Sequence, residues 1–299
     1  MGVTVENYAK GFYYPPPLPG LIRVVRFPGG ELRRGKVPNS TVWVFNAECH
    51  RYLPEILGND VGCGMAAFII PEVDPREAAE ALYAALKGKN ILGRGGHFVD
   101  ICSGIQSPHL DFEQPHHILV IHSDGKKTEH SPPQNIIEAQ LRERAAAAFR
   151  EELGHSLAER VLGVRCERIQ DWPHNLVYPN NGHIVYNHGV IATIPRSVHL
   201  LPAGLGRKIL MYTVDGNMPP HNAMPHAAGR KGDVQREAVP LEDIQALRTQ
   251  TAIPRDISDA ALAGEHPVHF NNHEVVLATL RDYIVPLGEL EILAYVGKV

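Results

Sequence analysis

One short segment constrains this chain more than any other, because its glycines, thiol and carboxylate demand a specific turn. Residues 59–65 read NDVGCGM, so Asp60 and Cys63 lie three positions apart and a glycine stands on each side of the thiol. Glycine permits tight or left-handed backbone and lets other groups approach closely. A carboxylate and a thiol on such a turn can point at one place, which makes half of a metal site. The alternative is a turn whose cysteine packs as a small apolar side chain.

Composition makes histidine the natural partner for that thiol. The 299 residues include 17 His but only four Cys, and the cysteines are widely spaced without a CxxC pair. This usage is typical of a reduced, intracellular protein, and we expect a cytoplasmic location. The sequence has neither a signal-peptide pattern nor an apolar run of membrane-spanning length, so we expect no membrane partner. A net charge of −4 argues against wholesale electrostatic binding to nucleic acid.

Helical and strand patterns alternate irregularly along the chain, which predicts one α+β domain over residues 1–299. Neither a P-loop nor a GxGxxG turn opening a helix is present. The first 45 residues are rich in Pro and Gly, and we expect loops and edge strands there. Hydrophobic spacing predicts helices over 75–87, 134–162, 241–248 and 274–283. Apolar runs predict strands over 64–70, 118–121, 183–194, 208–214 and 291–296.

The longest predicted helix, over 134–162, is also the most clearly amphipathic. Its pattern is interrupted at Gly154 and His155. The spacing predicts that one apolar face consists of Ile136, Leu141, Ala145, Ala148, Phe149, Leu153, Leu157 and Val161.

Four further segments each bring a histidine to a turn. They read GRGGHF at 93–98, HSDGK at 122–126, HN at 174–175 and PHAAGR at 225–230. Glycines before His97 can turn backbone N–H groups toward a phosphate, and His122 follows a short buried strand. In the last segment a neutral His226 is a competent nucleophile toward phosphorus, and Arg230 can stabilise the transition state. Each segment alone is a weak signal, and the alternative for each is an ordinary turn or loop.

Taken in order, the five segments resemble the RtcB family of RNA-splicing and repair ligases. The run from 187 to 205 and the LPAGLG turn at 201–206 also follow that family, and the resemblance extends from Glu48 to the C-terminus. It implies a single RtcB-like catalytic domain, in which mixed sheets pack with helices around a central metal cleft. The N-terminal ~45 residues would then be a divergent, shortened part of that domain.

The resemblance implies a GTP- and Mn²⁺-dependent RNA ligase. The family joins an RNA 3′-phosphate or 2′,3′-cyclic phosphate end to a 5′-hydroxyl end through a guanylylated histidine. The expected partners are therefore RNA and GTP, with any activating protein left open. Ligand chemistry alone favours Zn²⁺ at a thiolate–imidazole site, so Mn²⁺ enters only through the family.

The resemblance also assigns roles to individual residues. It makes His226 the nucleophile and Cys63 a thiolate that bridges two metal ions. The metal ligands it implies are Asp60, Cys63, His97, His122 and His174, with Asp60 and His97 on one ion and His122 and His174 on the other. The nucleotide-binding residues it implies are Gly96, Asp100, Asn175, Ala228, Gly229, Arg230 and Lys298. Since His226 must attack as the neutral imidazole, we expect neighbouring cations to lower its pKa.

Several positions depart from the family pattern. Gly96 stands where the family has Asn, Asp100 where it has Glu, and Lys298 precedes a terminal valine instead of glycine. The serines that the family places near guanosine are missing from the neighbourhood of Ala203 and Gly204. These departures keep two alternatives open. One is a metal-dependent phosphoesterase or nucleotidyl transferase with altered nucleotide choice, and the other is a non-catalytic metal-bound homologue that binds RNA or nucleotide.

Overall fold

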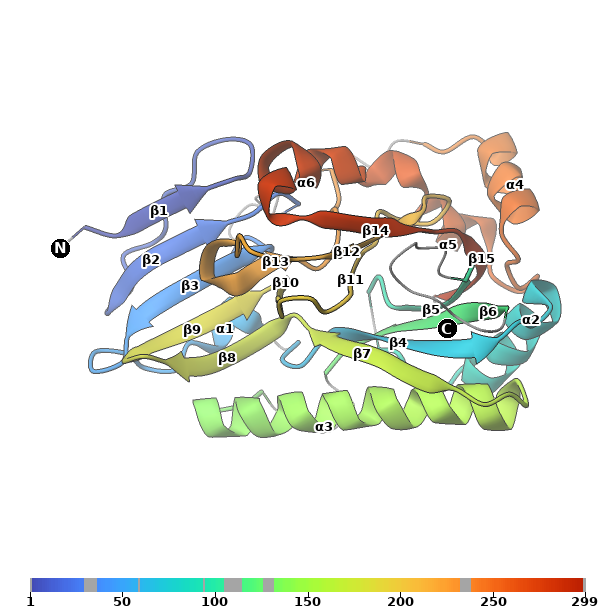
Figure 1. Ribbon diagram of the computed structural model, residues 1–299, viewed down its shortest axis with the longest axis horizontal. Coiled ribbons are helices and arrows are strands. Elements are labelled where there is room, and N and C mark those ends of the chain that lie inside the picture. The colour runs from blue at the N-terminus through green and yellow to red at the C-terminus, as the bar shows by residue number, and fades with distance from the viewer. Residues whose placement is uncertain are drawn as a thin grey trace.

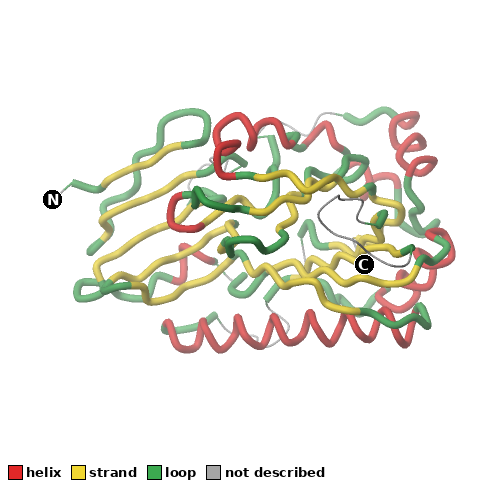
Figure 2. Tube along the Cα trace, in the orientation of Figure 1, coloured by secondary structure: helices red, strands yellow, loops and turns green. Residues whose placement is uncertain are grey.

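The chain folds into a mixed α+β structure, as the irregular alternation of its patterns predicts. The computed structural model describes residues 2–29, 37–58, 60–93, 95–104, 115–125, 132–231 and 238–297. Within these residues the strands form two five-stranded sheets, a three-stranded sheet and a two-stranded sheet. Strands fill the middle of the molecule and helices flank them on the outside (Figures 1 and 2).

The first sheet contains most of the N-terminal segment. Its order is β1 (Thr4–Asn7), β2 (Leu21–Arg26), β3 (Thr41–Asn46), β9 (His183–His188) and β8 (Asn175–Asn180). We expected loops and edge strands in the first 45 residues, which is right for β1 and wrong for β2 and β3. Both are interior strands, and residues 41–45 of β3 are all buried because the sheet is covered on both faces.

The second sheet is antiparallel throughout and contains three of the predicted strands. Its order is β15 (Ile292–Gly297), β5 (Phe98–Cys102), β6 (His116–Ser123), β4 (Gly64–Pro71) and β7 (Glu167–Pro173). The apolar runs at 64–70, 118–121 and 291–296 correspond to β4, β6 and β15. Strands β5 and β7 were not predicted, because charged or polar residues interrupt both segments.

The remaining strands form two smaller sheets. One contains β11 (His199–Leu201), β12 (Ile209–Thr213) and β14 (Val285–Leu290), and the other pairs β10 (Val190–Ala192) with β13 (Ala223–Pro225). The strand predicted over 183–194 is divided into β9 and β10 at Gly189. This residue has φ of 67°, and a Cβ there would lie 1.6 Å from Asn39 Oδ1. Glycine is therefore required at this division.

The predicted helices are all present, with small changes at their ends. The helical elements are α1 (Pro54–Leu57), α2 (Pro75–Leu86), α3 (Ile136–His155) with the π-helical turn η2 (Ser156–Val161), η3 (Pro220–Asn222), α4 (Leu241–Gln250), α5 (Asp259–Ala263), η4 (Pro267–His269), α6 (His273–Leu280) and η5 (Arg281–Tyr283). The interruption at Gly154 and His155 marks the change from α-helix to π-helix. Among the described helices, none is both long and apolar enough to cross a membrane.

Helix α3 runs beneath both five-stranded sheets and packs on β8 of one and on β4 and β7 of the other (Figure 1). The apolar face predicted for it is partly wrong. Leu153 and Leu157 are buried, but Leu141 is 58% exposed. The buried face consists instead of Ala139, Arg142, Ala146, Arg150, Leu153, Leu157 and Ala158. Small alanines let the helix approach the sheets closely, and a buried arginine is tolerated because it is paired.

Candidate metal centre

One end of the second sheet collects four of the five predicted metal ligands. Cys63 immediately precedes β4, His97 precedes β5, His122 is near the end of β6, and His174 follows β7. Because neighbouring strands are antiparallel, the starts of β4 and β5 lie beside the ends of β6 and β7. In register, Met65 pairs with His122, His122 with Phe98, and Gly64 with Pro173.

The glycines beside Cys63 are required by close packing against α3. Gly62 has φ of 83°, and a Cβ there would lie 2.9 Å from the Ala146 Cβ. A Cβ on Gly64 would lie 2.6 Å from the Arg150 guanidinium. This buried guanidinium donates to the Gly62 carbonyl at 2.7 Å and to both oxygens of Asp171 at 2.5 and 2.9 Å. Helix α3 and the ion pair between Arg150 and Asp171 therefore hold this turn in place.

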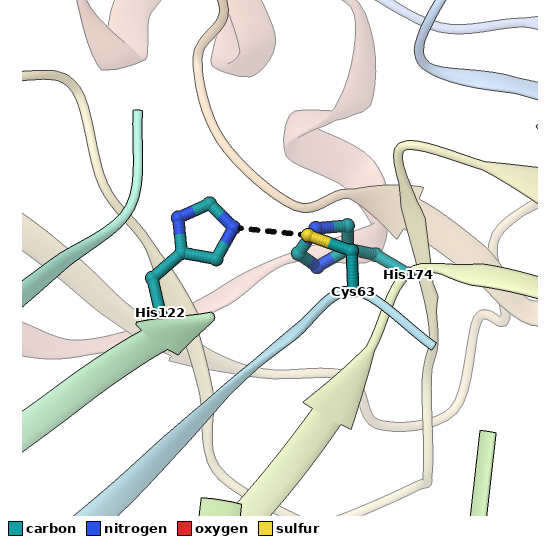
Figure 3. Close-up of side chains that lie close together, drawn as sticks. All are labelled: Cys63, His122 and His174. Carbon is teal, nitrogen blue, oxygen red and sulfur yellow. Dashed lines mark hydrogen bonds between the residues drawn. The ribbon is translucent and has the colours of Figure 1, made fainter. Parts of the chain in front are cut away.

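The five predicted ligands come together as two groups that share one sulfur atom. Cys63, His122 and His174 form one group, and Asp60, Cys63 and His97 form the other, with the ligand atoms of each within 4.8 Å of one another. The Cys63 Sγ lies 3.4 Å from His97 Nε2 and 3.5 Å from His122 Nε2. Figure 3 shows the first group, in which a dashed line joins the Cys63 sulfur to the His122 imidazole.

These separations fit coordination of a metal ion. Bonds of about 2.3 Å to sulfur and about 2.05 Å to nitrogen, at tetrahedral angles, place the two ligand atoms about 3.6 Å apart. Among the described residues, the buried Nδ1 of His174 has no hydrogen-bond partner. The backbone fixes this ligand, because His174 N donates to the Cys63 carbonyl at 2.9 Å and Val190 N donates to that of His174 at 3.1 Å.

The electrostatics of the cluster also favour a cation. Burial, reinforced by neighbouring imidazoles, lowers the pKa of His122 and of His174 well below the ordinary value, so both are neutral donors. Burial and the Asp60 carboxylate raise the pKa of the Cys63 thiol well above its ordinary value. A cation that binds both groups favours the thiolate and offsets its repulsion by Asp60. The residues present therefore fit a centre for one or two metal ions.

His226 lies against this centre. Its ring stacks on that of His174, with centroids 4.0 Å apart and planes at 18°, and lies 6.0 Å from that of His122. Its Nδ1 is 2.7 Å from the Gly189 carbonyl oxygen. A carbonyl only accepts, so Nδ1 carries the proton and Nε2 has the free lone pair. The pKa of His226 is lowered as expected, but burial is the cause, and no cation among the described residues stands beside it as a cause of the shift.

A cavity of about 420 Å³ opens beside His226 and His122. Four of the predicted nucleotide-binding residues line it, namely Gly96, Asp100, Gly229 and Arg230. The carboxylate of Asp100 is buried, and its Oδ1 has no hydrogen-bond partner among the described residues. Burial raises the pKa of this group well above the ordinary value. The cavity thus combines an apolar wall with the buried carboxyl group of Asp100, whose Oδ1 can accept a hydrogen bond from a ligand.

The other predicted nucleotide-binding residues have different positions. Ala228 is buried, and its carbonyl accepts from Asn271 Nδ2 at 3.1 Å. The Asn175 amide donates to the Asp60 carbonyl at 3.1 Å and accepts from Gly189 N at 2.8 Å, which links a ligand to the backbone that holds His226. Lys298 lies outside the described residues.

Hydrogen bonds and a ring contact hold the Arg230 side chain in the wall of the cavity. Its guanidinium donates to Glu265 at 3.0 and 3.2 Å and to the Gly264 carbonyl at 2.9 Å. The same group lies 4.2 Å above the Phe270 ring. Its positive charge is therefore shared with a carboxylate, which reduces what it can offer a phosphate.

Sequence reasoning missed the ion pair between Arg150 and Asp171. Asp171 precedes the HN segment without a motif of its own, and Arg150 is one of several charged residues in the predicted helix over 134–162. The available signal was its position, because Arg150 is on the same helical face as Ala146 and Leu153.

Comparison of the chain with models of known protein families and with curated protein sequences gave no match. Membership of the RtcB family therefore remains a hypothesis that rests on the ordered motifs. The geometry of the cluster stands independently of that hypothesis.

Proposed function

We propose that this protein is a GTP- and metal-dependent RNA ligase that joins 3′-phosphate or 2′,3′-cyclic phosphate ends to 5′-hydroxyl ends through a nucleotidylated His226. One observation carries the proposal. His226 lines the cavity and is stacked on His174, with its ring 6.0 Å from that of His122. A nucleophile, a site for cations and a space for a nucleotide are therefore adjacent to one another.

The tautomer of His226 suits nucleophilic attack. The hydrogen bond to Gly189 keeps the proton on Nδ1, so Nε2 can bond to the α-phosphorus of GTP without first losing a proton. The new P–N bond replaces the P–O bond to pyrophosphate, which leaves. The lowered pKa of His226 keeps the imidazole neutral at physiological pH. GMP then passes to the RNA 3′-phosphate, and the 5′-hydroxyl displaces it as the RNA ends are joined.

Asp60, Cys63, His97, His122 and His174 would hold the metal ions. Bound there, divalent cations neutralise phosphate charge and align the reacting groups. Thiolate and imidazole ligands favour Zn²⁺, whereas the resemblance implies Mn²⁺, so both ions belong in any test. Arg150 and Asn175 act as positioning residues, because they hold the backbone of Gly62, Asp60 and Gly189.

The cavity supports guanine as the base. The Watson–Crick edge of guanine presents N1–H and an exocyclic amino group side by side, and a carboxylate accepts from both. Asp100 offers a buried carboxyl oxygen without a partner among the described residues. Adenine presents one donor and one acceptor on the same edge, so it matches Asp100 less well than guanine does when the carboxyl group is ionised. Arg230 and Phe270 form part of the cavity wall.

The decisive experiment is covalent labelling with α-labelled GTP. Metal-stripped protein is supplied with Mn²⁺ or Zn²⁺, and transfer of label to the chain is followed by denaturing electrophoresis. We expect acid-labile labelling of the wild type that is absent from His226→Ala. The control is His221→Gln, which removes a partly buried histidine outside both ligand groups. Absence of label from wild-type protein with bound metal would refute the proposal.

A second candidate differs in the nucleotide or in the reaction. Gly204 borders the cavity without a hydroxyl group, and a Cβ there would lie 3.0 Å from the Phe270 ring. This wall is apolar where the family has serines, which favours a nucleotidyl transferase of altered base choice, or a phosphoesterase, as the alternative. Labelling by ATP and not by GTP supports the former, and release of phosphate without label supports the latter.

A further inference from the structure

A second cluster of metal-binding side chains lies away from the central site, at the C-terminal end of α3. It consists of His155, Glu159 and Cys166, whose ligand atoms lie within 4.8 Å of one another. The Cys166 Sγ is 3.2 Å from His155 Nδ1, and a Glu159 oxygen is 3.5 Å from the same nitrogen. We call these three residues the peripheral triad.

Local structure brings the three together. His155 ends α3, Glu159 lies in the π-helical turn η2, and Cys166 immediately precedes β7. A Cβ on Gly154 would lie 2.2 Å from the Phe68 ring, so glycine lets the helix approach β4. Phe68 then packs edge-on against the His155 imidazole, with centroids 5.8 Å apart, which fixes its orientation. A π-helical turn is uncommon and is often found at functional sites.

The contacts distinguish a metal site from a catalytic triad. In a Cys–His–acid relay the thiol and the carboxylate contact opposite nitrogens of the imidazole, so that a proton can pass across the ring. Here both the sulfur and the carboxylate face Nδ1. No relay is possible through one nitrogen. Three ligand atoms that converge on one point are instead the arrangement that a bound cation requires.

The separations and the ligand types indicate which cation. Coordination at tetrahedral angles places sulfur and nitrogen about 3.6 Å apart, and nitrogen and oxygen about 3.3 Å apart. The observed 3.2 and 3.5 Å are close to these values. A thiolate, an imidazole and a carboxylate together suit Zn²⁺. The partial exposure of all three side chains leaves room for a water molecule as the fourth ligand.

We propose that the peripheral triad binds a divalent transition metal of the Zn²⁺ class with one open coordination position. The site would lie at the C-terminal end of the helix formed by α3 and η2, where the helix dipole favours a cation. It would join that end to the start of β7, and His174 follows the other end of the same strand (Figure 1). A bound ion would therefore brace the helix and strand that support the central site.

Cobalt substitution provides a direct test, because a cysteine ligand gives Co²⁺ a thiolate charge-transfer band. The central thiol is first removed in Cys63→Ala, so that any remaining band reports another cysteine. We expect this variant to keep a band that Zn²⁺ quenches. The double variant Cys63→Ala with Cys166→Ser should lose it, whereas Cys63→Ala with Cys49→Ser should keep it, because Cys49 belongs to neither cluster.

Zinc stoichiometry gives an independent measurement on the otherwise intact chain. Glu159→Gln and Cys166→Ser should each bind one Zn²⁺ fewer than the wild type by calorimetric titration of metal-stripped protein. Circular dichroism in chelator establishes that each variant is folded. An unchanged stoichiometry in both variants, or a cobalt band that survives in the double variant Cys63→Ala with Cys166→Ser, would overturn the proposal. Neither result depends on GTP labelling at His226.

Discussion

The central site and the peripheral triad use the same kinds of ligand at similar separations, but they differ in burial. In the central site Cys63, His97 and His174 are almost fully buried. In the peripheral triad the His155 and Glu159 side chains are 42% and 57% exposed. Burying a polar group costs free energy unless the group gains a hydrogen-bond or metal partner. The buried ligand atoms of the central cluster therefore need such a partner. The peripheral triad is partly exposed to solvent, so a metal there would be an addition and not a requirement.

The largest difference is expected from removal of each thiol. Cys63→Ala deletes the one atom that both central groups share. We expect it to abolish binding of both central ions and to lower GTP labelling of His226 by roughly a thousandfold or more. Cys166→Ala should remove one ion and leave labelling unchanged. Metal content and label incorporation, measured on the same samples, test this difference between the two variants.

His226→Ala provides the complementary control. It should keep the central metals while removing the label, because His226 belongs to neither ligand group. If it also loses metal, the residue is a ligand and not the nucleophile. If Cys63→Ala retains one of two ions, the sulfur does not bridge them.

The next largest effect is expected on stability, from the ion pair that supports the central turn. Arg150 is fully buried and the Asp171 side chain is 10% exposed. Arg150→Met leaves that carboxylate without its buried partner, and we expect a loss of about 3–5 kcal/mol in the free energy of unfolding. Urea denaturation of metal-stripped protein measures it. Arg168→Met, at a half-exposed pair with Glu151, should cost less than about 1 kcal/mol.

A double variant separates stability from positioning. Arg150→Met with Asp171→Leu replaces the pair by apolar groups, which should restore much of the lost stability. It should not restore metal affinity, because the Gly62 carbonyl still lacks the Arg150 donor. Recovery of both together would mean that Arg150 has no role in positioning the turn.

The sequence was sufficient to locate the central site and most of its sheet. The resemblance to the RtcB family named Asp60, Cys63, His97, His122 and His174 as ligands, and antiparallel register brings four of them to one end of the sheet. Apolar runs gave β4, β6 and β15, because buried strands have a simple pattern.

Other features could not be predicted, for physical reasons that differ from case to case. A charged residue on a helix usually faces solvent, so only its position on the helical face of Ala146 and Leu153 indicated the burial of Arg150, and its partner Asp171 lies 21 residues away. The peripheral triad has no motif, because a π-helical turn and a close approach to Phe68 create it. His155 was noticed only as an interruption. Tertiary packing determined both features.

The dependence of stability on pH should be dominated by the central region. Burial lowers the pKa of His188, which borders the same cavity as His226, to about 4. Between pH 6.5 and 4 the unfolded chain therefore binds a proton that the native chain does not, and stability falls as the pH falls. The loss is about 3 kcal/mol at most. Urea titrations from pH 7.5 to 5 should show a shallower slope for His188→Gln, and equal slopes would contradict the assignment.

The smallest effect is expected at the peripheral triad in the absence of metal. Glu159 is 57% exposed and its contact with His155 is 3.5 Å, so Glu159→Gln should change the free energy of unfolding by less than about 0.5 kcal/mol in chelator. Arg150 lies on the same continuous helix, yet its replacement should cost several times more. With Zn²⁺ at a hundredfold excess over the dissociation constant, an intact triad gains about 2.7 kcal/mol. Glu159→Gln should lose most of that gain, because a neutral amide is a weaker ligand than a carboxylate. Equal stabilisation of both proteins by Zn²⁺ would assign the effect to the central site alone.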